Sequence, residues 1–263
     1  MVVLRYPGSK NSFRDALDTH LPDDVTAVAS PFFGGGAYEF HLAQRMDVVA
    51  ADLNTALVNF WNMTHEKPGA VADTVEQIGE RMNKEKFHGL REQLMQTTDT
   101  DLLLSDTTNC RVPAAAAFFV INRTSYNGIM RYYAPNAGRF TSSCVNKLRN
   151  FVWPERLNRL EQCDAFDFLE KHTEKFWFLD PPYYGVKAGL YGLNAEKHVF
   201  DHLRLADFLQ QHTTCRWMMT YDNHPDVWNM YKQFADIQEI DVHYSCRHTN
   251  KRELVIKSRA TIK

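Results

Sequence analysis

The most constraining feature of this sequence is an apolar segment that runs directly into three consecutive glycines. Residues 25–33 read VTAVASPFF, are rich in β-forming side chains, and precede the glycines at 34–36. This pattern predicts a buried strand that ends in a tight turn, because glycine adopts backbone conformations that other residues avoid. A helix over residues 37–46 and a second buried strand over residues 47–51 would complete the opening of a parallel α/β sheet.

Strand patterns return in the last third of the chain. Short apolar or alternating segments, typical of strands, cover residues 175–179, 215–221, 240–244 and 253–258. Between the first two of these segments, the spacing of apolar residues predicts one face of a helix formed by Val199, Leu203, Ala206 and Leu209.

Roughly a hundred residues separate the two sets of strands, a length that exceeds ordinary connections in compact domains. The first part of this stretch has a polar, helical pattern, and the second part combines a short apolar run with turn-forming residues. We therefore expect one α/β domain built from residues 1–54 and 151–263. A mainly helical module, residues 55–150, would be inserted into it.

Composition narrows the class of protein. No segment approaches twenty consecutive apolar residues, and the N-terminus lacks the apolar stretch and cleavage site of a signal peptide. We expect no membrane partner and a location in the cytoplasm, or inside a host cell if the source is viral. The five cysteines are far apart and form no C-x-x-C pair, which indicates free thiols, and the histidines show no spacing typical of a metal site.

The charge of the chain is unevenly distributed. A formal net charge of −2 disfavours a nucleic-acid partner, because phosphate contacts need basic side chains. Residues 111–159, however, contain eight basic residues and one acid, whereas residues 66–106 contain nine acids and five Lys or Arg. The pattern fits two solvated faces, and it also fits a basic surface that binds a polyanion.

The glycine turn and a later acid together indicate a nucleoside ligand. The dinucleotide pattern G-x-G-x-x-G is not matched, because Glu39 occupies the third glycine position, and no P-loop Lys-Ser/Thr follows. Asp52 stands at the end of the second strand, where an acid can accept hydrogen bonds from ribose hydroxyls. The alternatives are an ordinary tight turn and a helix N-cap. Together the two features favour a nucleoside cofactor without phosphates, such as S-adenosylmethionine.

The tetrapeptide Asp180-Pro181-Pro182-Tyr183 directly follows a predicted strand. Two prolines stop helix and sheet pairing and fix the backbone. The carboxylate and a proline carbonyl then offer two acceptors to an NH₂ group, and the aromatic ring can stack on a planar base. Methylation of an exocyclic amine requires such acceptors, because the amine lone pair is delocalised into the ring, and the base must leave the duplex first. A rigid turn with a capping aspartate is the alternative.

These elements, in this order, resemble the Dam-type DNA adenine-N6 methyltransferases, the D12 class of the alpha group. The resemblance rests on residues 6–10 (YPGSK), 31–36 (PFFGGG), 51–54 (ADLN), 122–131 (NRTSYNGIMR) and 180–183 (DPPY). Residues 251–254 (KREL) are similar to the entry of the family's C-terminal strand. The resemblance implies a Rossmann-like class I methyltransferase sheet with an inserted target-recognition module.

The resemblance also implies roles for individual residues. The catalytic residues would be Asp180, Pro181 and Tyr183. The cofactor-binding residues would be Tyr6, Lys10, Phe33, Gly34, Gly36, Asp52, Asp164 and Asp180. The DNA-binding residues would be Arg123, Tyr126, Asn127 and Arg131. The basic segment would then face double-stranded DNA, S-adenosylmethionine would be the methyl donor, and no metal would be required.

The implied activity is site-specific methylation of adenine N6 in double-stranded DNA. After Arg131, residues 132–140 depart from the pattern associated with GATC-specific enzymes, so GATC is not assumed as the target. A cognate restriction endonuclease as partner stays open. The alternatives are cytosine-N4 or RNA adenine methylation by the same pocket, and a catalytically silent DNA-binding relative. A dinucleotide oxidoreductase fits less well, because the phosphate-binding glycine pattern is incomplete.

Overall fold

The computed structural model of this chain describes residues 3–80, 82–97, 99–103, 108–134, 140–185, 199–244 and 249–260. Arg139, Cys246 and most of the segment that departs from the GATC pattern, residues 135–139, lie outside these ranges. The four cysteines within them, Cys110, Cys144, Cys163 and Cys215, are free. No helix in the described ranges combines the length and the apolar character needed to cross a lipid bilayer.

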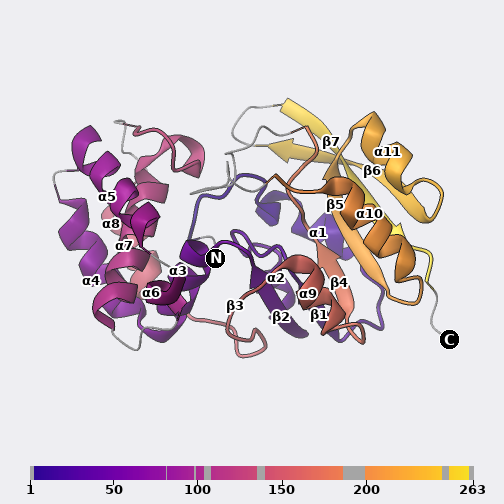
Figure 1. Cartoon of the computed structure of the whole chain (residues 1–263), viewed down its shortest axis with the longest axis horizontal. Coiled ribbons are helices and arrows are strands. Elements are labelled where there is room, and N and C mark those ends of the chain that lie inside the picture. Colours follow the sequence, from indigo (N-terminus) through magenta and orange to yellow (C-terminus); the bar gives the residue numbers. More distant parts are fainter. Residues whose placement is uncertain are drawn as a thin grey trace.

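A seven-stranded sheet in the order β3-β2-β1-β4-β5-β7-β6 forms the centre of the protein (Figure 1). The strands are β1 (Ala27–Ser30), β2 (Asp47–Asp52), β3 (Glu161–Gln162), β4 (Phe176–Leu179), β5 (Trp217–Asp222), β6 (Ala235–Tyr244) and β7 (Thr249–Ser258). The first five are parallel, and β7 runs antiparallel to both of its neighbours. The predicted α/β sheet is therefore confirmed. Because the strand order reverses between β1 and β4, a ligand crevice is expected at their carboxyl ends.

Alternating side chains divide the apolar interior into two cores, one on each face of the sheet. Phe178 and Met218 contribute to the core that also contains residues of α1 (Arg14–Asp18), α2 (Glu39–Leu42) and α3 (Thr55–Glu66). Trp177 and Met219 face the other core, which is covered by α9 (Ala165–Glu170), α10 (His202–Gln211) and α11 (Pro225–Tyr231). The helix predicted over residues 37–46 is only four residues long, because the glycine turn continues to Tyr38.

The apolar face predicted for α10 is only partly correct. Leu205, Ala206 and Leu209 are buried, but Leu203 is 65% exposed and Val199, before the helix, is 84% exposed. The helix begins at His202 because the side chain of Asp201 caps it by accepting a hydrogen bond from Arg204 N. The true apolar spacing therefore starts later than the sequence pattern indicated.

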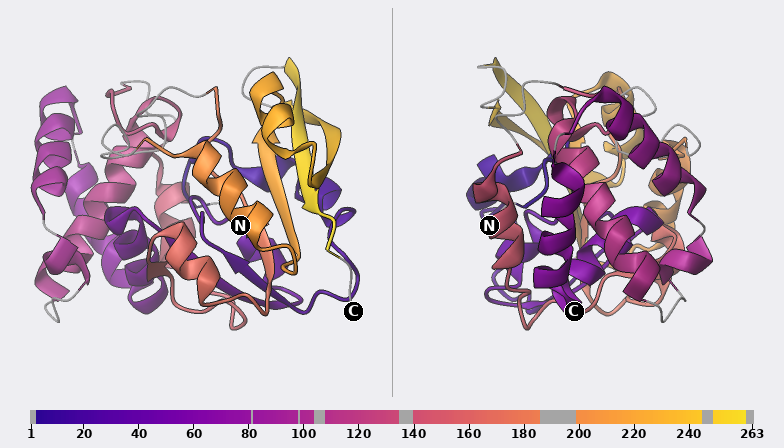
Figure 2. Two further views of the ribbon diagram at one scale, coloured as in Figure 1. Left: turned by 45° about the vertical axis from the view of Figure 1, so that its right-hand side comes forward. Right: turned by 90° about the vertical axis from the view of Figure 1, so that its left-hand side faces the viewer.

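Helices between β2 and β3 form a separate group beside the sheet (Figures 1 and 2). They are α4 (Pro68–Gly79), α5 (Lys84–Gln96), α6 (Asp99–Leu103), α7 (Thr108–Thr124) and α8 (Ser142–Arg149). Residues 114–121 of α7 are buried on every side, so α7 is the central helix of the group. The preceding helix α3 packs against α7 and against β2, and it therefore connects the group to the sheet.

Several residues of the basic segment are engaged within the protein. Arg149 pairs with Asp73 at 2.5 Å and with Glu76 at 3.0 Å, and Arg159 pairs with Glu66 at 3.0 Å. Arg111 also lies 3.9 Å from Glu66, and Arg156 donates to the carbonyl of Arg45. The acidic and basic segments thus face each other, and the expectation that the whole basic segment contacts DNA is too broad.

Candidate active site

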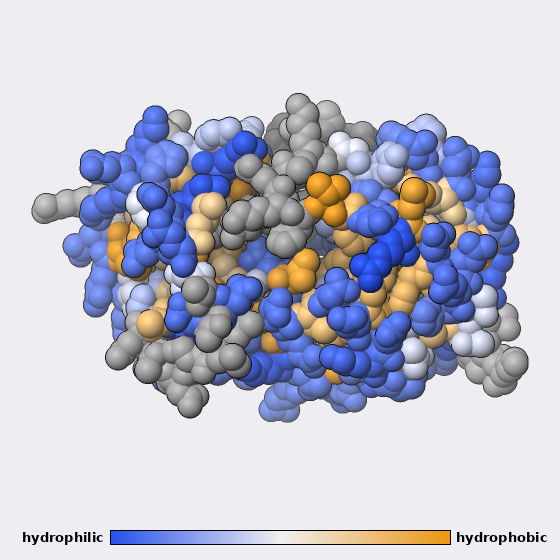
Figure 3. Space-filling view, in the orientation of Figure 1, coloured by the Kyte–Doolittle hydropathy of each residue, from blue (hydrophilic) through white to orange (hydrophobic). Residues whose placement is uncertain are grey.

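A cavity of about 920 Å³ opens at the carboxyl ends of β1, β2 and β4. Figure 3 shows a hollow near the middle of the molecule, where apolar side chains adjoin strongly polar ones. Every residue predicted for catalysis or cofactor binding lines this cavity: Tyr6, Lys10, Phe33, Gly34, Gly36, Asp52, Asp164, Asp180, Pro181 and Tyr183. The structure therefore brings together segments from both halves of the sheet. Leu94, Thr97, Asp99 and Leu102 of the helical group also reach its wall, which the sequence did not indicate.

The glycine loop has no room for side chains. Gly34 has a φ of +50°, and a Cβ atom there would lie 2.8 Å from the ring of Tyr6. Gly36 has a φ of +65°, and its Cβ would lie 2.5 Å from the ring of Phe33. The side chain of Phe33 is 2% exposed and packs against Trp61, so it supports the loop from the core. Its contribution to the cavity is therefore mainly its backbone.

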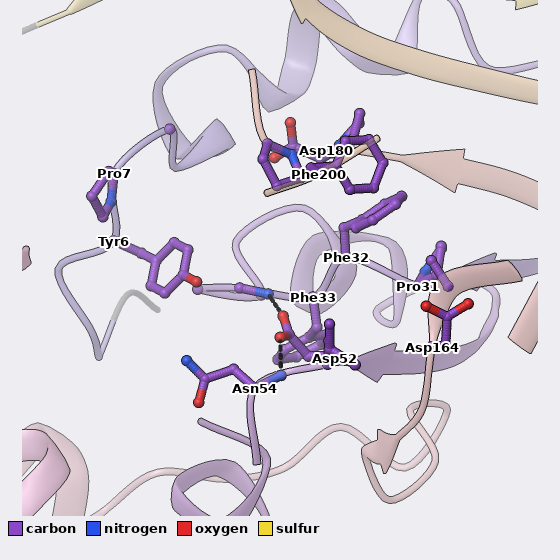
Figure 4. Close-up of a pocket in the computed structure, with 18 of the residues that line it drawn as sticks. Tyr6, Pro7, Pro31, Phe32, Phe33, Asp52, Asn54, Asp164, Asp180 and Phe200 are labelled. Atoms are coloured by element: carbon purple, nitrogen blue, oxygen red, sulfur yellow. Dashed lines mark hydrogen bonds between the residues drawn. The ribbon is translucent and has the colours of Figure 1, made fainter. Parts of the chain in front are cut away.

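The carboxylate of Asp52 holds the glycine loop against the end of β2 (Figure 4). It accepts hydrogen bonds from Gly34 N and from Asn54 N, each at 2.9 Å. Burial raises the pKa of Asp52 to about 6, and the two backbone hydrogen bonds oppose that rise. The helix N-cap of α3 is Asn54, which accepts from Leu57 N, so the N-cap alternative for Asp52 is wrong.

Asp180 is held from two sides directly after β4. Lys10, in a short 3₁₀ helix (η1, Lys10–Ser12), places Nζ 2.5 Å from Oδ2 of Asp180 and is only 3% exposed. The hydroxyl of Thr220 on β5 donates to Oδ1 of the same carboxylate at 2.7 Å. Two donors on opposite oxygens fix the orientation of the carboxylate. The structure thus places Lys10 as a direct partner of Asp180.

The ring of Tyr183 is enclosed by three contacts. Its hydroxyl donates to Oε2 of Glu253 at 2.6 Å, and its ring stacks on Tyr221 with centroids 5.9 Å apart. The ammonium of Lys10 lies 5.1 Å from the Tyr183 ring centroid. Tyr183 is 7% exposed and Glu253 is fully buried. No role was predicted for Glu253 from the sequence, although a carboxylate within the apolar run ELVI is a recognisable signal.

A second buried carboxylate lines the cavity at the start of α2. Glu39 is 3% exposed, and its Oε1 accepts the hydroxyl hydrogen of Ser30 at 2.7 Å. Burial raises the pKa of Glu39 to about 7, the hydrogen bonds from Ser30 and from the backbone oppose that rise, and the charges of Asp180 and Lys10 have smaller, opposite effects. In the sequence, Glu39 served only to exclude a dinucleotide-binding pattern. Its position beside the glycine loop was the signal that it reaches the ligand site.

Two further walls of the cavity lie near the cofactor-binding segments. Phe32 and Phe200 meet edge to face with centroids 5.5 Å apart, and both rings border the cavity (Figure 4). Asp164 caps α9 by accepting from Phe166 N at 3.0 Å. The guanidinium of Arg204 lies 3.9 Å from the centroid of the Phe166 ring, and both residues line the cavity, so this part of the wall carries a cation. The N-cap role of Asp164 does not exclude a ligand contact, because a carboxylate has further acceptor positions.

The predicted DNA-binding residues lie outside the cavity lining, on a tight turn and at the end of the helix α7 that precedes it. Tyr126 is 58% exposed, Arg131 is exposed, and Asn127 adopts a left-handed backbone with a φ of 51°. Tyr126–Gly128 form a 3₁₀ helix (η2), and the turn is closed by a bridge between Ser125 and Tyr133. Arg123 is half-buried at the end of α7.

The turn is fastened to the N-terminal segment by Asn122. The amide of this buried residue accepts from Arg5 N at 3.0 Å and donates to Arg5 O at 2.8 Å. A Cβ atom on Gly128 would lie 2.0 Å from Arg5 O, so only glycine fits there. Asn122, quoted in the DNA-contacting motif, is therefore a structural residue.

Among the residues described, one group has a spacing that could hold a metal ion. Ligand atoms of Asp15, Asp18 and His41 lie within 4.8 Å of one another, outside the cavity lining. Asp18 already accepts from Arg45 at 2.6 Å and from Tyr38 at 3.0 Å. These bonds explain the arrangement as an ion-pair network between α1 and α2.

With this geometry established, comparison with known proteins identifies the family. A model of the D12 class N6 adenine-specific DNA methyltransferases matches residues 6–246. This chain belongs to that family. The activity of the D12 class is methylation of adenine N6 in DNA, and the DNA substrate and a methyl donor of the S-adenosylmethionine type follow from membership.

Individual relatives agree with the D12 assignment. The type II methyltransferase M.MjaIII of Methanocaldococcus jannaschii is 23% identical over 79% of this chain and 78% of its own length. The type II methyltransferase M.CviBI of Paramecium bursaria Chlorella virus NC1A is 25% identical, with the same shares covered. A DNA adenine methylase of Vibrio cholerae is 28% identical over 49% of this chain and 43% of its own length. The resemblance seen in the motifs is thereby confirmed.

Proposed function

We propose that this D12 enzyme transfers a methyl group from S-adenosylmethionine to N6 of an adenine flipped out of double-stranded DNA. In this proposal Asp180, Pro181 and Tyr183 form the catalytic site. The observation that carries it is a single cavity lined both by Asp180 and by the glycine loop with Asp52. One end can bind an exocyclic amine, and the other end can bind a nucleoside.

The residues at the nucleoside end fit S-adenosylmethionine. The cavity of about 920 Å³ falls in the usual range for ligand pockets, roughly 300–1,000 Å³. The loop at Gly34 and Gly36 presents backbone to the cavity, because the rings of Tyr6 and Phe33 fill the space where side chains would lie. Asp52 stands where ribose hydroxyls can donate to it. Asp164 also lines the cavity and is proposed to contact the cofactor adenine, and the ring of Tyr6 packs against the loop at Gly34. When bound, the cofactor supplies an electrophilic methyl group on a sulfonium.

The residues at the amine end polarise and position the target. The Asp180 carboxylate and the Pro181 carbonyl accept the two N6 hydrogens and draw the nitrogen toward tetrahedral geometry, which makes its lone pair available. A carboxylate has about four acceptor positions, and the contacts with Lys10 and Thr220 leave others for the amine. Positioning and electrostatic preorganisation then lower the barrier without a covalent enzyme intermediate.

The helical module, residues 55–150, is proposed to recognise the DNA target. Arg123 and Arg131 would contact phosphates or a guanine edge, and Tyr126 and Asn127 would enter beside the target pair. Support comes from the exposure of Tyr126, which is 58%, and from the position of Asn127 in the same tight turn at the end of α7. A DNA substrate places the enzyme in the interior of a cell. A cognate endonuclease stays a prediction.

The test is methylation of unmethylated genomic DNA with labelled S-adenosylmethionine, followed by nucleoside analysis and modification-aware sequencing. We expect N6-methyladenine at one short motif with the wild-type chain and none with Asp180→Ala. The matched control is Asp207→Ala on α10, which removes an exposed carboxylate outside the cavity lining and leaves methylation unchanged. Label on cytosine or RNA would overturn the substrate. DNA binding without any label would favour the silent relative.

A further inference from the structure

Glu253 is a carboxylate buried inside the sheet next to the proposed catalytic motif. It lies on β7, opposite Asp222 of β5 in the antiparallel ladder, and has an exposed fraction of 0%. Burial of a carboxylate costs free energy unless strong hydrogen bonds offset it. One such bond comes from the Tyr183 hydroxyl at 2.6 Å, which is in the range of charge-assisted O–H···O bonds.

The environment of Tyr183 explains what this bond does to the ring. Tyr221 stacks on the Tyr183 ring at an interplanar angle of 26°, and the ammonium of Lys10 lies over it. Stacking and cation–π contacts limit the ring's position but still permit small rotations about the χ1 and χ2 bonds of the side chain. A hydrogen bond at the phenolic oxygen removes that freedom, because it fixes the end of the side chain farthest from the backbone.

The support extends to a second pair of polar groups. The hydroxyl of Tyr221 is hydrogen-bonded to Nδ1 of His202, the first residue of α10. Tyr183 and Tyr221 are therefore each held by a polar partner at the phenolic end, one on β7 and one on α10. The two stacked rings are thus fixed by side chains from two different elements, Glu253 on β7 and His202 on α10.

We propose that Glu253 is a positioning residue that fixes the Tyr183 ring for stacking on the flipped adenine. This inference rests on the proposed function, because the ligand of Tyr183 is the target base. Glu253 does not touch that base and acts only through the tyrosine. A Tyr183 ring that is held in one orientation aligns N6 of the stacked base with Asp180. Loss of the bond to Glu253 therefore lowers kcat more than it lowers the affinity for the cofactor.

A double-mutant cycle tests the pair with Tyr183→Phe, Glu253→Gln and the double variant. We expect Tyr183→Phe to lower kcat by about tenfold, the range of one lost hydrogen bond in the transition state. Glu253→Gln should lower kcat in the wild-type background but should cause no further loss when Phe is at 183. The affinity for S-adenosylmethionine should stay within about twofold in all variants, because the bond acts on the base.

The matched control is Tyr231→Phe, which also removes a buried phenolic hydroxyl. That hydroxyl has no hydrogen-bond partner among the described residues, and the Tyr231 ring packs near Tyr221. Its kcat should equal that of the wild type, and this comparison stands even if Glu253→Gln fails to fold.

Losses that multiply in the double variant would overturn the proposal, as would an unchanged kcat in Tyr183→Phe or a loss confined to cofactor affinity. If the wild-type chain does not methylate adenine at all, the proposed function fails instead.

Discussion

The ammonium of Lys10 lies 2.5 Å from the carboxylate of Asp180, although 170 residues separate them in the chain. Lys10 is 3% exposed, and Asp180 has a side-chain exposure of 22%. A cation at this depth is stable only because the carboxylate balances its charge, so removal of either partner leaves an uncompensated charge in a desolvated site. The pair therefore links the N-terminal segment to the end of β4.

Replacement of Lys10 by Met keeps the length of the side chain and removes its charge. We expect a loss of about 3 kcal/mol in the free energy of unfolding, in the range found when one partner of a buried pair is deleted. Lys175→Met is the control, since Lys175 pairs with Glu174, an exposed acid, at 2.7 Å. That change should cost about 1 kcal/mol or less. Urea unfolding measures both, and equal losses in the two variants would contradict a special role for Lys10.

The buried carboxyl of Glu39 predicts a pH dependence of stability. Its pKa is raised to about 7 from the ordinary value of 4.5, so the folded state holds this proton at pH values where the unfolded chain has released it. Stability contributed by the neutral carboxyl is present below the unfolded pKa and is lost as pH rises through the folded pKa. The loss is on the order of 3 kcal/mol.

Glu39→Gln removes this titration and keeps a group that can bond to Ser30. We expect the variant to gain stability relative to the wild type between about pH 5 and about pH 8, because its free energy of unfolding lacks this loss. Urea midpoints at both pH values measure the difference. Asp52 titrates in the same direction with a pKa of about 6, so part of the slope should persist in the variant. A slope as steep as in the wild type would show that Glu39 does not titrate in this range.

The left-handed glycine at position 36 predicts a strong effect of a single methyl group. Gly36→Ala places Cβ 2.5 Å from the Phe33 ring and forces an L-residue into a φ of +65°. We expect a loss of stability of about 1–3 kcal/mol and a weaker affinity for S-adenosylmethionine.

Gly89 in α5 is the control, because a Cβ there meets nothing within 4 Å. Gly89→Ala should raise stability by roughly 0.5–1 kcal/mol, since alanine is the better helix former. Thermal unfolding and calorimetric titration with the cofactor compare the two variants. Normal cofactor affinity in Gly36→Ala would argue against a cofactor loop.

The arginines of the basic segment should separate into two classes. Arg131 is exposed on the turn, with its guanidinium 5.5 Å from the Tyr132 ring, whereas Arg149 is paired with Asp73 and Glu76. We expect Arg131→Ala to weaken DNA binding and to reduce the slope of log affinity against log salt by about one.

Arg149→Ala should leave that salt slope unchanged, because its charge is already neutralised by helix α4. Fluorescence anisotropy with a duplex over a range of salt concentrations distinguishes the two. A reduced slope in Arg149→Ala, with none in Arg131→Ala, would place the DNA surface at α8 and not at the turn.

Much of the fold was predictable because the patterns that mark a strand and the turn after it lie within a few consecutive residues. The segments before Gly34, Asp52 and Asp180 are short apolar runs that end at polar or conformationally special residues, and each became a strand that ends at the cavity. The antiparallel insertion of β7 between β5 and β6 was not predicted. Strand order depends on which apolar edges meet in three dimensions, and no local pattern encodes it.

Residues of the candidate site that belong to a sequence motif could be predicted. Residues that contact the motif from distant parts of the chain could not. Asp180 and Tyr183 stand in a recognisable tetrapeptide, but their partners Thr220 and Glu253 lie on other strands. The ion pairs of Arg149 with α4 were missed for the same reason. A charge count along the chain does not reveal which charges meet.

The segment from Arg5 to Lys10 has a role at each end. At Arg5 the backbone is bonded to the Asn122 amide beside the exposed turn, and at Lys10 the side chain is bonded to Asp180. Four residues lie between these ends, and they form a turn in which Ser9 N donates to Tyr6 O at 3.2 Å. Gly128 leaves no gap beside Arg5, so the turn and this segment are in direct contact. In the proposed function, this short stretch of backbone joins the turn that contacts DNA to the carboxylate that positions the target amine.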